Sequence, residues 1–508
     1  MIKKNPIRKR EIAAWLLLYG ANILLFTTIY FLDRYDKVAL DQILFSLKSP
    51  GDGTASDMFL SAFFRIGVLG TVATLLQLLL CWLCCGRFSF CRAAWYLRYC
   101  SGNACRRVKN LLLPITSILL AATVVFTVIA LRMVPYALAI STESDFIEKY
   151  YVDPDEVTLT FPQDKKNLIY IVLESMENTF AQPQAEGSIK EDYIPELSAM
   201  ADRYINFSHN EHLGGAYSFD GATWTAASLC AQTSGIVVKV PVVGENYGEN
   251  GTFISGLTSI GDILQEQGYN QTVLFGSDAN FGGREAYFTE HGGYKIVDIK
   301  LLKAQGRLPE DYKEWWGFED EKLFAYAKEE LTALAASGEP FNFTMLTADT
   351  HFPNGYLCRR CGTNYDEQYA NVLSCSSEQV SQFVEWIKKQ DFYEDTVIVL
   401  TGDHLTMDPD FMANINPDYT RTVYNCFINA ANLPVYEKNR EFGVFDMFPT
   451  TLAAMGVDIE GERLGLGTNL FSAKDTLTER FGYAYLNEEL QLRSEFYNDA
   501  LLEGASND

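Results

Sequence analysis

The segment "TVIVLTGDH", residues 396–404, ends a run of apolar residues in two ionisable side chains. The run is apolar at consecutive positions, which is typical of a strand buried on both faces of a parallel sheet. A protein interior does not accept Asp403 and His404 without partners. Because sites in open parallel sheets lie beyond the carboxyl ends of the strands, this segment predicts both a fold class and a site.

Similar apolar runs recur along the chain, separated by amphipathic stretches that predict helices. "NLIYIVLESMENTF" (167–180) predicts a buried strand followed by a helix. Further strands are expected at 271–277, 341–347 and 423–430, and helices at 255–269, 320–337 and 377–390. The alternation predicts an α/β domain whose mainly parallel sheet is covered by helices on both faces.

The N-terminal part differs in charge and hydropathy. Residues 1–140 carry 16 Lys and Arg against 6 Asp and Glu, whereas residues 141–508 carry 25 against 59. The acidic balance of the larger part argues against nucleic acid as a partner. Three apolar runs, at 12–32, 59–85 and 111–131, are each long enough for a transmembrane helix, which takes about 20 residues.

The sequence therefore predicts a membrane anchor over 1–135, a polar and acidic linker over 136–166 and a catalytic domain over 167–508. Lys and Arg concentrate on the cytoplasmic side of membrane proteins. The first ten residues carry five of them, and the loop 86–110 carries six with no acidic residue. We expect the N-terminus in the cytoplasm and residues 167–508 outside it.

Polar side chains at three predicted strand ends are candidates for one site. They are Glu174, Asp349 with His351, and Asp403 with His404. Each alone can be a structural cap, but at the same sheet edge they indicate a site. Two carboxylates and an imidazole suit a divalent cation with one open position, and Mn²⁺, Mg²⁺ and Zn²⁺ all fit these ligand types.

A nucleophile is expected in "GGAYSFDGATWTAASLC" (214–230), where a glycine-rich stretch turns into a helix. A hydroxyl at a helix start lies near unpaired backbone N–H groups, which favour its deprotonated form. Thr225 and Thr223 both fit this spacing, and Ser218 is a third candidate.

Seven segments in this order resemble the phosphoglycerol transferase and lipoteichoic acid synthase family, a membrane-anchored branch of the alkaline phosphatase and sulfatase superfamily. They are "NLIYIVLESMENTF", "ATWTAAS", "FGGREAYFTEHGGY", "THFPNG", "TVIVLTGDHLTM", "FDMFPTTLAAMGV" and "LGLGTNLF". The resemblance implies a sulfatase-like catalytic domain. "DHLTM", and "CGTNYDEQYANVLSC" after "THFPNG", are closest to the branch that modifies periplasmic glucans.

The resemblance also implies roles for individual residues. Glu174, Thr225, Asp403 and His404 match the metal ligands, usually around Mn²⁺, and Thr225 matches the nucleophile. Arg284 and His351 match residues that hold the phosphoglycerol headgroup. Two positions depart from the lipoteichoic acid synthase pattern, which leaves the acceptor open: Gly282 replaces an aromatic residue and Asp408 replaces a serine.

The activity that the resemblance implies is transfer of sn-glycerol 1-phosphate from phosphatidylglycerol to a hydroxyl acceptor, foremost a periplasmic glucan. It would proceed through a phosphoglycerol-threonine intermediate and release diacylglycerol at the bacterial inner membrane. The alternatives are phosphoethanolamine transfer, polyglycerolphosphate synthesis of the lipoteichoic acid type, and a non-catalytic membrane-anchored sensor or glucan-binding protein.

The part expected outside the cytoplasm has an odd number of cysteines: Cys230, Cys358, Cys361, Cys375 and Cys426. An oxidising compartment favours disulfides. "CRRC" lies in a polar stretch rather than at a helix start, so one or two structural disulfides among Cys358, Cys361 and Cys375 are expected. The family resemblance favours the Cys361–Cys375 pair and leaves the pairing of Cys230, Cys358 and Cys426 open.

Overall fold

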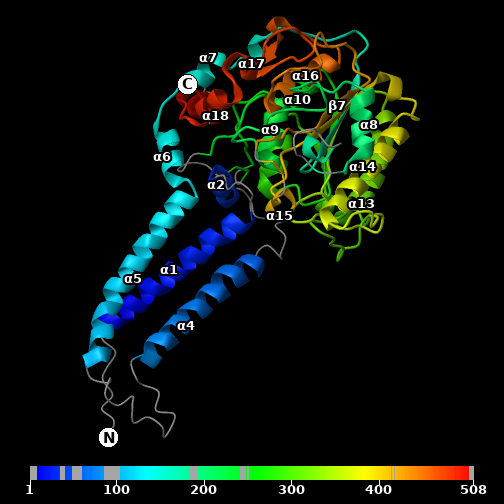
Figure 1. Cartoon of the computed structure of the whole chain (residues 1–508). Helices are drawn as coiled ribbons and strands as arrows, with labels where there is room; N and C mark the ends of the chain where they lie inside the picture. Colours follow the sequence, from blue (N-terminus) through cyan, green and yellow to red (C-terminus); the bar gives the residue numbers. More distant parts are fainter. Residues whose placement is uncertain are drawn as a thin grey trace. The chain divides into compact units, whose positions relative to one another are not determined.

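The computed structural model describes residues 9–34, 40–48, 60–84, 103–181, 189, 191–240, 247–248, 251–413, 415–416 and 418–502. The chain divides into two compact units (Figure 1). The first comprises residues 1–40 and 55–137, and the second comprises residues 41–54 and 138–508.

The first unit is helical. Its elements are α1 (Lys9–Arg34), the π-helix η1 (Phe63–Val68), α4 (Leu69–Cys84), α5 (Asn103–Ala130) and the start of α6 (Met133–Ser141). Three helical segments are long and apolar enough to cross a membrane: Lys9–Arg34, Leu60–Cys81 and Asn110–Ala130. The three predicted apolar helices are confirmed, while the basic residues before Lys9 and most of the loop 86–110 lie outside the described residues.

Polar side chains join the helices of the first unit. The amide of Asn22 on α1 donates to Thr74 Oγ1 and Gln77 Oε1 on α4, each at 2.8 Å. The hydroxyls of Thr28 on α1 and Thr127 on α5 are 2.7 Å apart. Hydrogen bonds of this kind hold apolar helices together where lipid removes the hydrophobic driving force.

The second unit contains a six-stranded sheet in the order β4-β3-β5-β2-β6-β7. Its strands are β2 (Asn167–Leu173), β3 (Asn270–Phe275), β4 (Lys295–Val297), β5 (Phe341–Leu346), β6 (Thr396–Gly402) and β7 (Asn425–Ile428). All neighbouring pairs are parallel except β6 and β7. The prediction of a mainly parallel sheet is therefore confirmed.

Helices cover both faces of this sheet, as predicted (Figure 1). On one face, α8 (Pro195–Arg203), α13 (Asp320–Ala335) and α14 (Gln368–Ile387) share an apolar core with β2, β5 and β6. Other helices of the unit are α9 (Thr225–Ser234), α10 (Ile260–Glu266) and α16 (Met447–Ala454). The register sets Leu173 of β2 opposite Gly402 of β6, so these central strands end side by side.

The remaining helices, helical turns and strands of the second unit are short. They are α2 (Leu40–Lys48, whose first residue falls in the first unit), α7 (Phe146–Tyr150), η3 (Pro154–Glu156), β1 (Leu159–Thr160), η4 (Asn178–Phe180), η5 (Phe281–Gly283), α11 (Arg284–Glu290), α12 (Ile299–Ala304), η6 (Tyr393–Asp395), α15 (Pro409–Met412), η7 (Val444–Asp446), β8 (Asp458–Ile459), η8 (Glu460–Glu462), β9 (Arg463–Leu464), β10 (Gly467–Thr468), α17 (Leu477–Phe481), α18 (Tyr483–Gln491) and the π-helix η9 (Tyr497–Leu502).

Some element bounds differ from the sequence-based expectation. The helix expected within 167–180 is only the single 3₁₀ turn η4. The helix expected at 255–269 shrinks to α10, because Ser259 and Asp262 form a capping box that starts it there. Helix α14 starts at Gln368, before the predicted residue 377. The expected linker, 136–166, contains α7 and β1, and β1 pairs with β8.

Candidate metal centre

Glu174, Asp403 and His404 lie together beyond the ends of β2 and β6. Their ligand atoms all lie within 4.8 Å of one another. His404 Nε2 is 3.3 Å from Asp403 Oδ2 and 3.6 Å from Glu174 Oε1. The three residues are at most 3% exposed. Residues that are far apart in the sequence thus converge because two parallel strands end side by side.

Backbone and hydroxyl groups orient both carboxylates. Ser175 adopts a left-handed backbone (φ 53°), so its N–H donates to Asp403 Oδ1 at 2.7 Å while its hydroxyl donates to Glu174 Oε1 at 2.8 Å. The backbone N–H of Glu174 donates to Thr347 Oγ1 at 3.0 Å. These contacts fix the carboxylates before any ligand binds.

The cluster has the properties of a cation site. Asp403 Oδ2 is buried and has no hydrogen-bond partner. Burial, reinforced by the charge of Glu174, raises the pKa of Asp403 to about 7. His404 Nδ1 pairs with the carbonyl oxygen of Leu405 at 2.9 Å, which leaves Nε2 facing the two carboxylates. Since uncompensated buried carboxylates are unfavourable, this donor set fits a divalent cation.

Thr225 is the hydroxyl that the structure brings to this cluster. As the first residue of α9, it places Oγ1 3.3 Å from Glu174 Oε2 and 3.4 Å from His404 Nε2. Thr223 Oγ1 and Ser218 Oγ, the other two candidates, are buried without a hydrogen-bond partner. The geometry therefore distinguishes Thr225 from the alternatives that its sequence context left open.

Helix α9 is attached to the end of β6. Ser228 donates its hydroxyl proton to the carbonyl oxygen of Asp403. The amide of Gln232 donates to the carbonyl oxygen of Gly402 at 2.9 Å. One face of the helix is thus fastened to the strand that supplies Asp403 and His404, which keeps Thr225 in register with them.

Arg284 lies at the start of α11 and is buried. It donates from Nε to Phe281 O at 2.9 Å and from Nη2 to Ser277 Oγ and Asp278 O. Burial lowers the pKa of Arg284 to about 10, and the negative charges of Glu174, Asp278, Asp298 and Asp403 oppose that shift. Arg284 therefore remains a cation near neutral pH and within electrostatic reach of the cluster.

His351 lies in the loop after β5. Its ring stacks on Phe352, with centroids 5.0 Å apart, and lies 4.6 Å from the ring of Trp316. The preceding residue, Thr350, donates its hydroxyl proton to the carbonyl oxygen of Glu174 at 2.6 Å. The loop is therefore tied to the cluster through Thr350. Asp349, another strand-end candidate, instead accepts the backbone N–H of Asp320.

Sequence reasoning missed a buried ion pair beside the cluster. Glu177 accepts two hydrogen bonds from Arg421, at 2.7 and 2.8 Å, and a third from the N–H of Thr406 at 3.1 Å. Arg421 also donates to the carbonyl oxygen of Thr406. The pair thereby fixes the chain directly after His404. No local pattern signals it, because its two members are far apart in the sequence.

The two departures noted in the sequence have structural reasons. Gly282 has φ 67°, and a Cβ there would lie 3.4 Å from Ala226 Cβ and 3.8 Å from the ring of Phe45. Asp408 caps α15 by accepting the N–H of Phe411 and also accepts the N–H of Asn354 at 2.9 Å. An aromatic residue at 282 would therefore be strained by this backbone conformation.

Helix α2 was not predicted, and it lies beside the start of α9, which carries Thr225. Phe45 is 2% exposed, and its ring centroid is 5.2 Å from those of Trp224 and Tyr247. Gln42 Nε2 is 3.4 Å from Met407 Sδ. The short segment between the first two apolar helices thus contacts both sides of the centre: the residue before Thr225 and the loop after His404.

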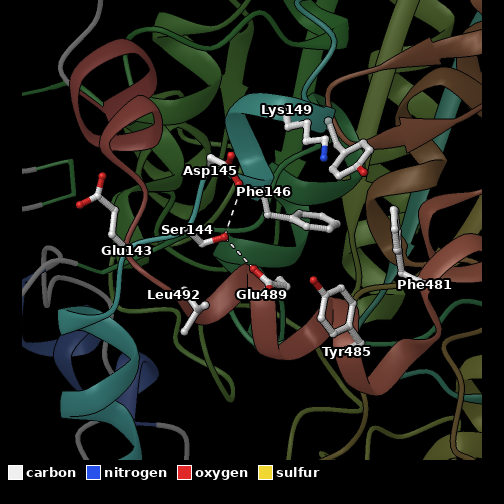
Figure 2. Close-up of a pocket in the computed structure, with 10 residues that line it drawn as sticks. Glu143, Ser144, Asp145, Phe146, Lys149, Phe481, Tyr485, Glu489 and Leu492 are labelled. Carbon is white, nitrogen blue, oxygen red and sulfur yellow. Dashed lines mark hydrogen bonds between the residues drawn. The ribbon is translucent and has the colours of Figure 1, made fainter.

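A separate hollow opens between α7, α17 and α18 (Figure 2). Phe146, Tyr150, Phe481 and Tyr485 supply its aromatic surface. Two polar lining residues are hydrogen-bonded to each other: Ser144 donates its hydroxyl proton to Glu489 Oε2 at 2.6 Å. None of its lining residues belongs to the metal cluster.

All the cysteines that the structure describes outside the first unit are free thiols. Cys358 Sγ lies 3.6 Å from Cys361 Sγ and 3.7 Å from Cys375 Sγ. Cys230 and Cys426 are buried away from these three. The Cys230 thiol lies next to the Ser234 hydroxyl, and the Cys426 thiol lies next to the carbonyl oxygen of Met200. The Cys361–Cys375 disulfide stays a prediction.

Comparison with known proteins places this geometry in context. The sulfatase family profile matches residues 166–457. Phosphoglycerol transferase I of Salmonella choleraesuis (strain SC-B67) is 30% identical over 339 residues, covering 65% of this chain and 42% of that protein. The protein of the same name from Escherichia coli O6:K15:H31 is 30% identical over 332 residues, covering 64% and 41%. The chain thus spans less than half the length of these curated relatives.

Two of the solved structures that match this chain are the following. The lipoteichoic acid synthase LtaP from Listeria monocytogenes has a TM-score of 0.48 and 18% identity, covering 64% of this chain and 80% of its own. The lipooligosaccharide phosphoethanolamine transferase EptA from Neisseria meningitidis has a TM-score of 0.49 and 15% identity, covering 89% and 85%.

Proposed function

The chain belongs to the sulfatase family, and on that premise we propose that it transfers sn-glycerol 1-phosphate from phosphatidylglycerol to an acceptor hydroxyl outside the cytoplasm. The observation that carries the proposal is the position of Thr225 Oγ1, 3.3 Å from Glu174 and 3.4 Å from His404. The 30% identity with proteins named phosphoglycerol transferase I supports phosphoglycerol as the transferred group.

The reaction has two displacements at phosphorus. A divalent cation held by Glu174, Asp403 and His404, Mn²⁺ in this proposal, would lower the pKa of the Thr225 hydroxyl and polarise a phosphoryl oxygen. Thr225 Oγ1 releases its proton to water, to be regained when Thr225 is freed, and attacks phosphorus, so that the bond to the diacylglycerol oxygen breaks and phosphoglycerol remains on the threonine. An acceptor hydroxyl then attacks the same phosphorus and frees Thr225.

Two further residues assist these displacements. Arg284 offers its planar guanidinium to the phosphoryl oxygens, where its charge opposes the negative charge that develops there. His351 gives a proton to the departing diacylglycerol oxygen and takes one from the entering hydroxyl. The acceptor in this proposal is a periplasmic glucan.

The membrane arrangement fits a lipid donor. We place the N-terminus in the cytoplasm of a bacterial cell and the second unit outside its inner membrane, following the distribution of Lys and Arg. The three apolar helices then keep the enzyme at the bilayer that contains phosphatidylglycerol and receives the diacylglycerol.

The test uses the purified full-length chain in nanodiscs with phosphatidylglycerol labelled in its terminal glycerol, and Mn²⁺. We expect diacylglycerol release, a labelled peptide containing Thr225 and, when glucan is added, labelled glucan. Thr225→Ala should lower diacylglycerol release at least 1000-fold, because removal of a nucleophile leaves only residual catalysis.

The matched control is Thr223→Val, which removes a neighbouring hydroxyl that has no described partner. It should retain activity within a few-fold. Unchanged release by Thr225→Ala would refute the nucleophile. Headgroup transfer from labelled phosphatidylethanolamine, with none from phosphatidylglycerol, would instead identify a phosphoethanolamine transferase. Labelled chains of polyglycerolphosphate would identify synthesis of the lipoteichoic acid type.

A further inference from the structure

Three cysteines of the second unit form a compact cluster away from the proposed active site. Cys358 and Cys361 lie in the loop between β5 and α14, and Cys375 lies on α14. Cys358 Sγ is 3.6 Å from Cys361 Sγ and 3.7 Å from Cys375 Sγ, and all three ligand atoms lie within 4.8 Å of one another. No residue of this cluster belongs to the group formed by Glu174, Asp403 and His404.

The spacing of the sulfurs matches a tetrahedral metal site. A disulfide requires an S–S distance of about 2.05 Å. Zinc bound to thiolates at about 2.3 Å with tetrahedral angles places its sulfur ligands about 3.8 Å apart. Two of the three sulfur–sulfur distances of this cluster lie close to that value, and the third is at most 4.8 Å, which is compatible with one face of such a tetrahedron.

A tight turn of the backbone holds two of these cysteines close together. Cys358 and Cys361 flank a tight turn in which the N–H of Cys361 donates to the carbonyl oxygen of Cys358 at 3.1 Å.

A buried amide points at the same place. Gln379 lies one helical turn after Cys375 on α14 and is 2% exposed. Its Nε2 is 3.4 Å from Cys375 Sγ and 3.9 Å from Cys358 Sγ, whereas its Oε1 has no hydrogen-bond partner. Rotation of the side-chain amide by 180° exchanges its nitrogen and its oxygen. Oε1 then faces the sulfurs and can occupy the fourth ligand position of a metal ion.

We propose that Cys358, Cys361 and Cys375 bind a structural Zn²⁺ ion, with the amide oxygen of Gln379 as the fourth ligand. Thiolates select soft cations such as zinc over Mn²⁺ or Mg²⁺. Binding forms three zinc–sulfur bonds and releases three thiol protons to solvent, with no change in oxidation state. The ion fastens the loop 347–367, which carries His351, to α14.

The test is metal binding by the purified full-length chain, reduced and stripped of metal. One equivalent of Co²⁺ should give thiolate-to-cobalt charge-transfer absorption, which carboxylate and imidazole ligands do not produce, and Zn²⁺ should abolish it. Cys361→Ser and Cys375→Ser should each lose this absorption and one equivalent of tightly bound zinc. Cys426→Ala, which removes a buried free thiol outside the cluster, should retain both.

A second measurement uses the unaltered chain, so that its result does not depend on whether the cysteine variants fold. Alkylation of the metal-free chain should block one tight zinc equivalent, and prior zinc loading should protect Cys358, Cys361 and Cys375 from alkylation. A disulfide between any two of them in protein isolated without reductant, together with no charge-transfer absorption after reduction, would overturn the proposal. So would zinc binding that is unaffected by Cys361→Ser and by alkylation.

Discussion

Ser175 shows how single residues hold the candidate metal centre together. Its N–H and hydroxyl contact a different carboxylate each, Asp403 and Glu174. We expect Ser175→Ala to weaken Mn²⁺ binding about 10-fold or more, because groups that orient metal ligands contribute 10–100-fold to affinity. The measurement is transferase activity as a function of Mn²⁺ concentration, with the maximal rate recovered at high Mn²⁺.

The matched control for this prediction is Ser376→Ala. Ser376 is equally buried, but its hydroxyl has no hydrogen-bond partner. It should leave the Mn²⁺ dependence unchanged. If both variants shift the Mn²⁺ dependence alike, or neither does, Ser175 does not orient the ligands.

The site residues divide into those that the sequence predicts and those that it does not. Glu174 and Asp403 could be predicted because each follows a consecutively apolar run, and strand ends in parallel sheets converge. Ser175, Ser228 and Thr347 could not, because serine and threonine are common and only the folded backbone brings their hydroxyls to the cluster. Glu177 and Arg421 were missed because a long-range pair has no local pattern.

Helix α2 is the element whose contacts bear most directly on the nucleophile. Phe45 packs against Trp224, Tyr247 and Phe253. Removing a buried phenylalanine ring costs about 3–5 kcal/mol, more than a nine-residue helix gains from its own hydrogen bonds. We expect Phe45→Ala to release α2 and lower kcat/KM for phosphatidylglycerol about 10-fold or more, measured together with hydrogen exchange of residues 40–48.

Ser46→Ala is the comparison for that experiment. Ser46 is exposed on the same helix, and its hydroxyl contacts only the backbone of Gln42. Exchange and kcat/KM should both stay within two-fold of the unaltered chain. Rapid exchange of 40–48 in Phe45→Ala with unchanged kcat/KM would show that α2 docks without serving the reaction.

The docking of α2 should also depend on pH. Burial, reinforced by Asp220, raises the pKa of Asp41 to about 6, from an unfolded value of about 3.9. The docked helix therefore holds this proton more tightly than the released helix. Docking is strongest below about pH 4 and weakens as pH rises to about 6. Hydrogen-exchange protection of 40–48 should fall across this window, after correction for intrinsic exchange.

The variant Asp41→Asn tests whether the Asp41 carboxyl causes this pH dependence. Asparagine keeps an oxygen that accepts the N–H of Gln42, now bonded to Asp41 Oδ1 at 2.9 Å, but it does not titrate. Protection of 40–48 should then be constant between pH 4 and 6. Lys239, whose pKa burial lowers to about 7, titrates in a higher window. If the protection of 40–48 still falls with rising pH in Asp41→Asn, another group causes the pH dependence.

The elements themselves were predictable to different degrees. Strands β2, β5 and β6 are mostly apolar and almost completely buried, and the three apolar N-terminal helices are long, so both patterns are strong. Strand β4 has three residues, too few to show a period. Helix α2 is short and packs on residues far along the chain, so nothing within its own sequence indicates its position.

At the scale of the whole molecule, α2 constrains the membrane topology. It lies between the first and second apolar helices in sequence, yet it belongs to the same compact unit as residues 138–508. A single folded unit lies on one side of a membrane. If the second and third apolar helices both cross, α2 and residue 138 lie on the same side, and if the first also crosses, the N-terminus lies on the opposite side.

The contacts of α2 give this placement of the two chain ends without use of the charge distribution. A protease-protection experiment tests it, on cells whose inner membrane is accessible to protease from outside. An epitope before residue 1 should be protected, whereas one after residue 508 should be cleaved. The orientation follows from the positive-inside rule, while the opposite placement of the two ends follows from the parity of three crossings. If protease removed both epitopes, or neither, the number of crossings would be even, and the predicted three-crossing topology would be wrong.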